Sequence, residues 1–184
     1  MQYTSEEAGE KLLRSYERFY DITRYDSDGK TEPVKGARLI ARCDFFEYSE
    51  KYVLIKKAKI WEADCEDFLY LFSTDRLTVE TADECRRYVW EDGKPRIHVG
   101  PGHMYSYVTM VIVCNSADEN ARGALKKYKD SQSFLFSLHG WMTLRAAAVI
   151  LPEGKIITNW NGREAGQSVN NVLYPKQSVK ERKE

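Results

Sequence analysis

The stretch Tyr107-Val-Thr-Met-Val-Ile-Val-Cys114 decides the fold of this chain. It is almost wholly apolar and β-branched, and no charged side chain interrupts it. A continuous run of this kind is typical of a central strand that is covered on both faces, because an exposed face would require alternating polar residues. We therefore expect 107–114 to be the strand against which the flanking helices pack.

Upstream of this strand, the sequence predicts a helix followed by three strands. Thr4 and Glu7 have the spacing of a capping box and open the helix. From 37 to 72 the chain becomes β-branched and aromatic, and Tyr48–Lys51 reads as the turn between two long strands. A third strand, Phe68–Phe72, is expected after the acidic interruption at 62–67.

Two more helices and three more strands are expected around and after the central strand. Thr81 with Glu84, and Ser116 with Glu119, repeat the capping-box spacing and predict one helix on each side of it. The first of these helices should end near Asp92-Gly93. Strands are predicted at 134–138, 144–151 and 156–160, with the last two joined as a hairpin.

The expected order is therefore α-βββ-α-β-α-βββ. It predicts an α/β mixed (α+β) fold, with a central mixed sheet of about six strands flanked by about three helices. The length of 184 residues fits a single globular domain over residues 1–174. Residues 175–184 are charged and poor in apolar side chains, so we expect a frayed tail.

Composition narrows the partners and the compartment. The 28 basic and 28 acidic side chains cancel, which disfavours nucleic acid but leaves a small anionic ligand or a protein partner open. The cysteines are widely spaced and form no CxxC pair, so free and mostly buried thiols are expected at Cys43, Cys65, Cys85 and Cys114. With no apolar signal region and no run of ~20 apolar residues, we expect a cytoplasmic protein without a membrane span.

The first candidate site is the loop Ile97-His-Val-Gly-Pro-Gly-His-Met104. Gly100 and Gly102 let a ligand approach the backbone closely, and His98 and His103 could bind a metal or move a proton near neutral pH. The alternative interpretation is a tight Gly-Pro-Gly turn with two solvated histidines.

The second candidate site combines polar side chains around 139–163. Gly140 interrupts an apolar region, which often marks a bulge or a close approach of another group. Arginine offers a planar fork for carboxylate or phosphate, and asparagine offers amide recognition. The candidate residues are His139, Trp141, Arg145, Asn159, Asn161 and Arg163. The alternative is structural, because Asn-Gly is an ordinary turn dipeptide and tryptophan often fills a core.

Acidic residues on the first strands give a third possibility. Carboxylates of Asp44, Glu62, Asp64 and Glu66 could together hold Mg²⁺. The element order resembles the PD-(D/E)xK nuclease-like fold, in which an Asp and a D/E-x-Lys tripeptide on adjacent strands bind the metal and activate water. Here the tripeptides Asp28–Lys30, Asp92–Lys94 and Glu153–Lys155 all fall in Gly-containing turns, so the motif itself is absent from the strands.

A second resemblance covers the C-terminal half. The segments SFLFSLHGWMTLRAAAVIL and KIITNWNGRE, with the apolar strand before them, resemble uncharacterised prokaryotic domains of unknown function. No activity comes with this likeness. It implies only that Gly140, Trp141, Asn159, Gly162 and Arg163 form a shared feature.

The sequence does not specify a reaction. The best-supported hypothesis is a cytosolic binding or regulatory domain without catalytic machinery of its own, with no cofactor, and able to form a homo-oligomer through an edge strand or helix face. One alternative is a metal-dependent nuclease-like enzyme that uses Mg²⁺, or an inactive relative. Another is a small-molecule enzyme with His98 or His103 as general base.

Overall fold

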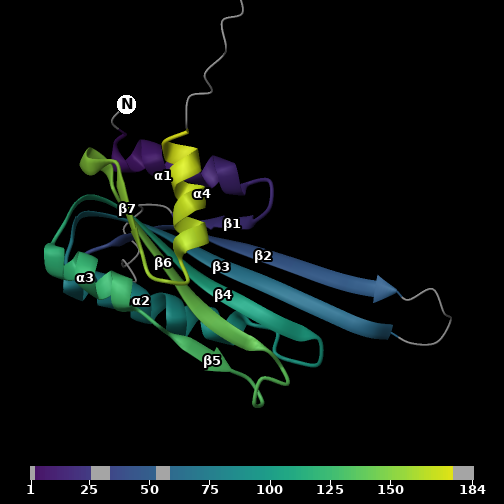
Figure 1. The fold of residues 1–184 in the computed structure, drawn as a ribbon. Helices are drawn as coiled ribbons and strands as arrows, with labels where there is room; N and C mark the ends of the chain where they lie inside the picture. The colour runs from purple at the N-terminus through teal and green to yellow at the C-terminus, as the bar shows by residue number, and fades with distance from the viewer. Residues whose placement is uncertain (1–2, 26–33, 53–58, 176–184) are drawn as a thin grey trace, which may run out of the picture.

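A seven-stranded mixed sheet forms the middle of the molecule (Figure 1). The computed structural model describes residues 3–25, 34–52 and 59–175, with the backbone alone for 47–52 and 59–64. The strand order is β1-β2-β3-β4-β6-β5, and β7 also pairs with β6. The bounds of the strands are β1 Asp21–Arg24, β2 Arg38–Tyr52, β3 Lys59–Leu77, β4 His103–Ala117, β5 Ser131–Ser133, β6 Trp141–Ile150 and β7 Lys155–Thr158.

The predicted central strand is confirmed as the core of β4. This strand lies between β3 and β6 and runs parallel to both, with Val108 beside Phe68 on one side and Leu144 on the other. Residues 108–114 are all buried. A strand with neighbours on both edges and helices on both faces has no position for a charged side chain, which explains the unbroken apolar run.

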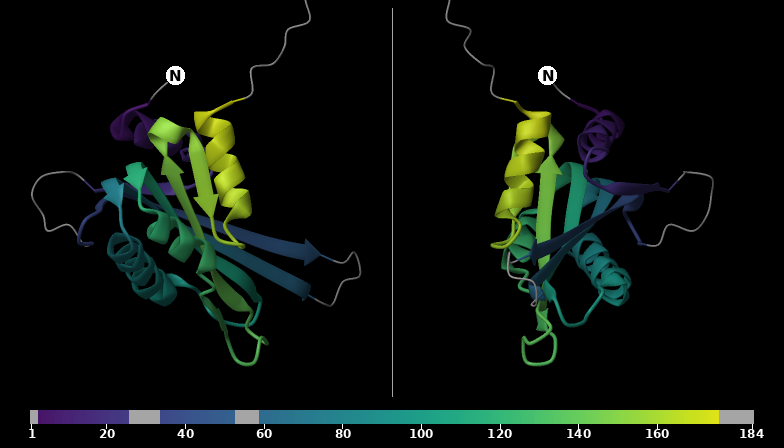
Figure 2. Two further views of the ribbon diagram at one scale, coloured as in Figure 1. Left: turned by 60° about the vertical axis from the view of Figure 1, so that its left-hand side comes forward. Right: turned by 90° about the vertical axis from the view of Figure 1, so that its right-hand side faces the viewer.

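Two helices cover each face of the sheet (Figures 1 and 2). Among the described residues there are four α-helices: α1 Ser5–Tyr16, α2 Val79–Gly93, α3 Glu119–Lys127 and α4 Arg163–Leu173. Helices α2 and α3 pack on Val108, Met110 and Ile112, and helices α1 and α4 pack on Val111 and Val113. Alternate residues of β4 thus contribute to two separate apolar cores.

The helix starts follow the predicted capping chemistry only in part. At α1 the capping box is present: Thr4 Oγ1 accepts from the N–H of Glu7 at 3.2 Å, and the Glu7 carboxylate accepts from the N–H of Thr4 at 2.9 Å. Helix α2 begins earlier than predicted, because Thr78 supplies the cap to Thr81. Helix α3 begins after Asp118, because Ser116 still belongs to β4.

Strands β2 and β3 are longer than the sequence predicted. The expected turn at Tyr48–Lys51 is wrong, since these residues lie in β2 and pair with 61–64 of β3. The acidic stretch 62–67 is likewise part of β3. The pair forms a two-stranded arm that extends past the rest of the sheet (Figure 1). An arm of this kind needs main-chain pairing rather than burial, so charged residues do not interrupt it.

Three elements differ from expectation at the ends of the sheet. Strand β1 was not predicted, and the described part of 37–72, where the sequence predicted three strands, is formed by β2 and β3, with Phe68–Phe72 inside β3. The strand predicted at 134–138 is a loop, and β5 lies just before it. Helix α4 was also not predicted. The hairpin of β6 and β7 is confirmed, with Ala148 opposite Ile157.

The cysteines of the described residues are free, as predicted. Burial raises the pKa of the Cys43, Cys85 and Cys114 thiols to about 12, which keeps them protonated and unreactive. Within the part of the chain that is described, no helix combines the length and the apolar character needed to cross a membrane. The tail predicted to fray lies outside the described residues from 176 onward.

Candidate functional site

A buried carboxylate, Glu66, lies at the amino end of the parallel strands. Its residue is 2% exposed, and β3 places it directly beside Ser106 of β4. The carboxylate accepts from Ser106 Oγ at 3.0 Å, from the main-chain N–H of His98 at 3.2 Å, and from His98 Nδ1 at 2.7 Å. No lysine or arginine of the described residues lies within ion-pair distance of it. Hydrogen bonds, rather than a fixed cation, therefore hold this buried acid.

The network continues from Ser106 to a second histidine. His103 Nε2 is 2.7 Å from Ser106 Oγ, and His103 Nδ1 is 2.6 Å from the carbonyl oxygen of His139. A carbonyl only accepts, so Nδ1 carries a hydrogen. The Ser106 hydroxyl has one hydrogen but two neighbours, Glu66 and His103. Two arrangements of protons satisfy these hydrogen bonds. Either His103 is an imidazolium facing a Glu66 carboxylate, or both groups are neutral and Glu66 donates to Ser106.

Both arrangements hold the same number of protons. Passing from one to the other moves one proton from Glu66 to Ser106 and another from Ser106 to His103. Ser106 is therefore placed as a relay between an acid and a base that are both buried. The sequence alternative of two solvated histidines fails for His103, which is 4% exposed.

His98 is the solvent-facing member of this network. Its side chain is 68% exposed, while its Nδ1 is directed at Glu66. When Nδ1 donates to the carboxylate, Nε2 is free to accept, which is the orientation of a general base. The two candidate glycines differ: Gly102 has φ +103°, a left-handed conformation that favours glycine, whereas Gly100 has open space where a Cβ would lie.

Part of the second candidate group joins this first loop. The carbonyl of His139 accepts from His103, and Gly140 has φ +72° and lies so close to the Met104 carbonyl that a Cβ would collide with it. Trp141 is 43% exposed and stacks on Tyr105 at 6.2 Å between ring centroids. His139 therefore lies beside His103, whereas Trp141 lies beside Tyr105; the other four candidates lie farther along β6 and beyond β7.

Arg145 belongs to the opposite face of the sheet. Its guanidinium carbon lies 3.1 Å from the Tyr107 ring centroid, and its Nη1 is 3.9 Å from the Asp67 carboxylate. Arg145 Nε is buried without a hydrogen-bond partner among the described residues. Asp67 accepts from Thr109 Oγ1 at 2.7 Å and from the Tyr20 hydroxyl at 3.1 Å. Burial raises the pKa of Asp67, although Thr109, Arg145 and Tyr20 oppose that shift.

Asn159 forms a structural junction. Its Oδ1 accepts from the main-chain N–H groups of Ala146 and Gly162, and its Nδ2 donates to the carbonyls of Tyr128 and Leu144. The residue is 1% exposed and its amide is fully used, so it has no capacity left for a ligand. Asn161 is exposed in the turn that follows.

A groove along β7 gathers cations around the remaining candidate, Arg163. We call it the β7 groove; it has a volume of ≈ 410 Å³, and its polar and aromatic lining comprises Lys126, Lys155, Thr158, Asn159, Trp160 and Arg163. The cations come from α3, from β7 and from the start of α4. Figure 2 shows β7 at the side of β6, with α4 next to it. Trp160 is 68% exposed and carries the Arg163 guanidinium on its ring, 3.7 Å from the centroid.

The acidic set proposed for Mg²⁺ is only partly described. Asp44 binds the Arg42 guanidinium at 2.8 Å, and Glu66 is used by His98 and Ser106. The side chains of Glu62 and Asp64 lie outside the described part of the chain. Among the described side chains, no group of three or more His, Cys, Asp or Glu residues could hold a metal ion.

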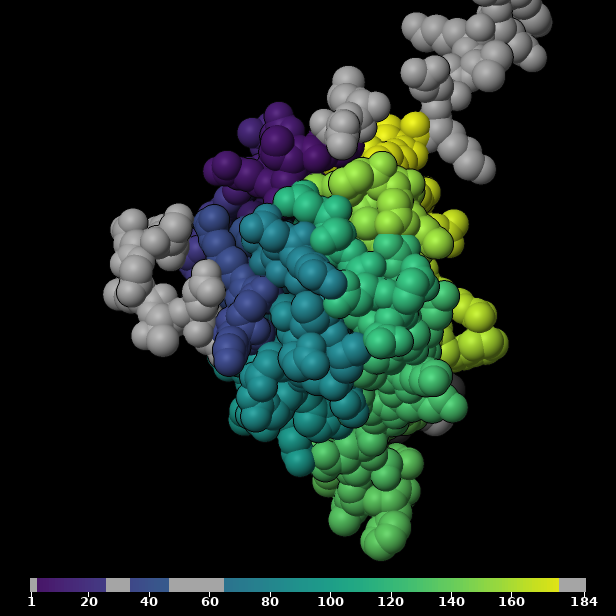
Figure 3. All heavy atoms as spheres, turned by 90° about the vertical axis from the view of Figure 1, so that its left-hand side faces the viewer, coloured from purple at the N-terminus to yellow at the C-terminus, as the bar shows by residue number. Residues whose placement is uncertain are grey.

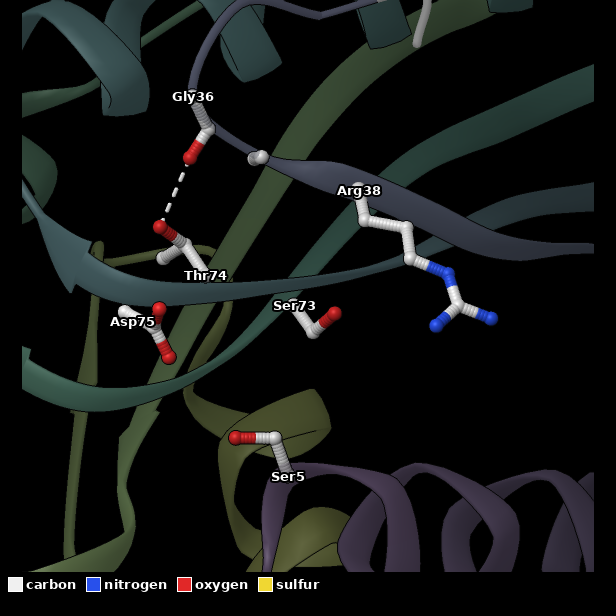
Figure 4. A pocket seen from close by; sticks show the side chains of 7 residues that line it. Ser5, Gly36, Arg38, Ser73, Thr74 and Asp75 are labelled. Atoms are coloured by element: carbon white, nitrogen blue, oxygen red, sulfur yellow. Dashed lines mark hydrogen bonds between the residues drawn. The ribbon is translucent and has the colours of Figure 1, made fainter. Parts of the chain in front are cut away.

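A second hollow, of ≈ 390 Å³, lies at the carboxyl ends of the strands (Figure 4). Open α/β sheets often bind ligands at this end. Ser5 of α1 faces Ser73, Thr74 and Asp75 of β3, and Thr74 Oγ1 donates to the Gly36 carbonyl at 2.8 Å. Arg38 points away from Asp75, which instead accepts from Asn115 at 3.1 Å. The lining thus mixes one cation, one anion and hydroxyls that are partly engaged, and it favours no ligand class.

Several site residues were not identified from the sequence. Ser106 stands in a strand pattern that reads as core, and only its register with Glu66 gives it a role. Lys126 belongs to no sequence motif, and Lys155 falls in the Gly-containing turn Glu153–Lys155. The exposed Trp160, flanked by Asn159 and Asn161, was the one signal that could have pointed to the groove.

Comparisons with known proteins give a family but no activity. Neither a search of curated proteins nor a search of solved structures found a match. A family model described as a domain of unknown function (DUF8052) matches residues 4–171, which is most of the chain rather than its C-terminal half. The chain therefore belongs to the DUF8052 family, and its function has to be argued from its own geometry.

Proposed function

We propose that this chain is a binding domain whose ligand carries phosphate or carboxylate groups, and that the β7 groove holds them. The observation that carries the proposal is the lining itself. Lys126, Lys155 and Arg163 surround one hollow together with an exposed tryptophan, and no carboxylate from the described part of the chain lines it. This cationic surround is favourable for an anion and unfavourable when empty, because like charges repel.

The cations are available to a ligand. Within the described residues, none of the three lies within ion-pair distance of a carboxylate. The nearby Glu153 is held by Arg122, with Nη1 to Oε2 at 2.8 Å. That bond, more than Lys155, keeps the pKa of Glu153 below its ordinary value. The charge of Glu153 is therefore already neutralised by Arg122.

Arg163 and Trp160 give the cationic surface a defined geometry. Stacking on the indole holds the guanidinium plane in place, and a planar fork suits bidentate contact with phosphate or carboxylate. The N–H groups of the first turn of α4 add positive potential at the same point. The groove volume of ≈ 410 Å³ lies in the range of small-molecule sites, ~300–1,000 Å³.

The test is a titration of the purified protein with phosphate, pyrophosphate, ATP and citrate at matched ionic strength. Tryptophan fluorescence and calorimetry give the affinity, and the phosphate and carboxylate arms separate the two chemistries. We expect saturable binding that weakens about tenfold or more in Arg163→Gln and Lys126→Gln, since each removes a charged contact. Lys127→Gln is the matched control, because Lys127 lies on the same helix outside the lining. Absence of saturable binding, or an equal loss in the control, contradicts the proposal.

A second candidate function is acid–base catalysis at His98. The observation that favours it is the 2.7 Å contact of His98 Nδ1 with buried Glu66, which orients the free Nε2 toward solvent. Hydrolysis of 4-nitrophenyl acetate, in which Nε2 acts on the ester carbonyl or on water, would test it. Rates that fall to the buffer value in His98→Gln support this candidate, and unchanged rates contradict it.

The proposed binding domain works in the cytosol. Free thiols persist in reducing compartments, where disulfides are rare. Expression with a fluorescent tag and fractionation of cells would check the compartment.

A further inference from the structure

The loop after β5 has an unusual backbone. It connects β5 to β6 and is closed by main-chain hydrogen bonds from Phe134 to the Gly140 carbonyl at 2.9 Å and from His139 to the Phe134 carbonyl at 3.2 Å. Between them Leu135, Phe136 and Ser137 have φ values of 45°, 51° and 67°. Three consecutive L-residues in the left-handed region cost about 1–2 kcal/mol each. The loop is therefore both well connected and strained.

The strain turns apolar side chains outward. Phe136 is 95% exposed, Leu138 is 77% exposed and Leu135 is 57% exposed. In the space-filling view the segment 134–140, in green, projects from one end of the molecule (Figure 3). An isolated chain gains nothing from this arrangement, because it combines a backbone cost with apolar surface left in water.

Neighbouring side chains enlarge this apolar surface. Trp141 and Met104 are 43% and 38% exposed; Trp141 follows the loop in the chain, and the main chain of Met104 lies against Gly140. We call Met104, Leu135, Phe136, Leu138 and Trp141 the apolar tip. The tip exposes on the order of 600 Å², taking roughly 200 Å² for a fully exposed large side chain. A patch of ~300–600 Å² is already the largest that a typical monomer exposes.

The tip is also free of fixed charge. No Lys, Arg, Asp or Glu occurs in 97–117 or in 131–144, the two segments that form this end of the molecule. Two identical surfaces that meet across a two-fold axis place like groups near like groups. An uncharged surface does so without repulsion, whereas a charged one would need compensation.

We propose that the apolar tip is the contact surface for a second copy of this chain in a two-fold dimer. Two tips together bury on the order of 1,200 Å², the lower bound of specific protein interfaces. Strand β5 ends the sheet on this side and pairs with no further strand of the described residues, so a strand edge lies beside the tip, and such an edge is normally covered. The absence of basic residues makes an anionic membrane a poorer fit, because such surfaces attract Lys and Arg.

The dimer is tested by measuring mass in solution across a concentration series, by light scattering after size exclusion and by sedimentation. We expect wild type to be dimeric, and the double variant Phe136→Ser with Leu138→Ser to be monomeric or to dissociate at a concentration at least tenfold higher. Phe19→Ser is the matched control, because Phe19 is 62% exposed but lies after α1. It should leave the dimer unchanged.

A further variant separates assembly from folding. Phe136→Gly removes the side chain and the left-handed strain together, so it should lower the dimer affinity while leaving thermal unfolding as cooperative as in wild type. Three results overturn the proposal: a wild-type monomer at its highest soluble concentration, dissociation of the control to the same degree, or a dimer that survives the tip variants. A monomer that instead binds phosphatidylcholine vesicles would assign the tip to a membrane.

Discussion

Glu66 and Asp67 are adjacent in β3 and buried on opposite faces of the sheet, yet the two faces treat the carboxylates differently. On the α2 and α3 side, Glu66 contacts a serine and a histidine that reaches solvent. On the α1 and α4 side, Asp67 contacts a threonine, a tyrosine and the Arg145 guanidinium. One acid is thus connected to the outside by groups that exchange protons, and the other is enclosed with a permanent cation.

The difference teaches that burial alone does not define a functional carboxylate. Both acids receive a hydrogen bond from a hydroxyl of β4: Ser106 is the direct strand partner of Glu66, and Thr109 lies two residues beyond Tyr107, the strand partner of Asp67. The two acids differ in the side chain that each of these hydroxyls contacts next. Ser106 also contacts His103 Nε2 at 2.7 Å, whereas Thr109 contacts no histidine among the described residues.

Removing each acid should give the largest contrast. Glu66→Ala leaves Ser106 and His98 without their acceptor and should lower the free energy of unfolding by about 3–5 kcal/mol. Asp67→Ala should lower it by about 2 kcal/mol, because the carboxylate is already disfavoured by burial and Arg145 retains Glu164. Urea unfolding measures both losses. The expectation is wrong if the two losses are equal or if Asp67→Ala loses more.

The two hydroxyls allow a finer comparison. Ser106→Ala removes the link between Glu66 and His103 and should cost about 2 kcal/mol, because two buried groups lose their partner. Thr109→Val removes one hydrogen bond to Asp67 and keeps the shape, so about 1 kcal/mol is expected. Chemical denaturation of both variants measures the two losses. The expected order is wrong if Thr109→Val is less stable than Ser106→Ala.

The pH dependence of stability should distinguish Asp67 from an ordinary surface acid. Its pKa is raised in the folded state, so the native protein favours the protonated carboxyl. The stability of wild type relative to Asp67→Asn is therefore greatest below the unfolded pKa of ~3.9 and falls as pH rises through the folded pKa. Urea midpoints of both proteins across that range measure the difference, and a difference that grows with pH would refute the assignment.

His98→Ala should have the smallest effect. The imidazole is 68% exposed, and Glu66 retains Ser106 and the main-chain N–H of His98, so a loss below about 1 kcal/mol is expected. A much larger loss in thermal unfolding would mean that His98 is a structural rather than a solvent-linked member of the network.

The sequence predicted the parts of the fold that depend on burial. The run ending at Cys114 indicated a covered strand, and three of the cysteines expected to be mostly buried, Cys43, Cys85 and Cys114, are buried. The sequence did not predict the elements whose formation does not depend on burial. Helix α4 begins at Gly162 without a side-chain cap, so it gave no start signal. The apolar run at 134–138 reads as a strand, because none of its residues is a glycine that would announce a left-handed loop.

The sequence identified many residues of the candidate site but not which of them lie together. The loop of His98 and His103 was found from its glycines, whereas the acid that connects the two histidines lies on another strand. Only the register of β3 against β4 brings Glu66 to Ser106. In the same way, Arg163 was found but was grouped with Arg145, which lies on β6 and contacts Asp67 instead.

Asn159 separates the scaffold of the β7 groove from its charge. One amide side chain joins the main chain of β6, the end of α3 and the start of α4, and none of these bonds involves a residue that presents charge to the β7 groove. The hydrogen bonds that shape the groove therefore do not depend on its cations. Substitution of Lys126 or Lys155 should change the charge of this surface and leave its backbone in place.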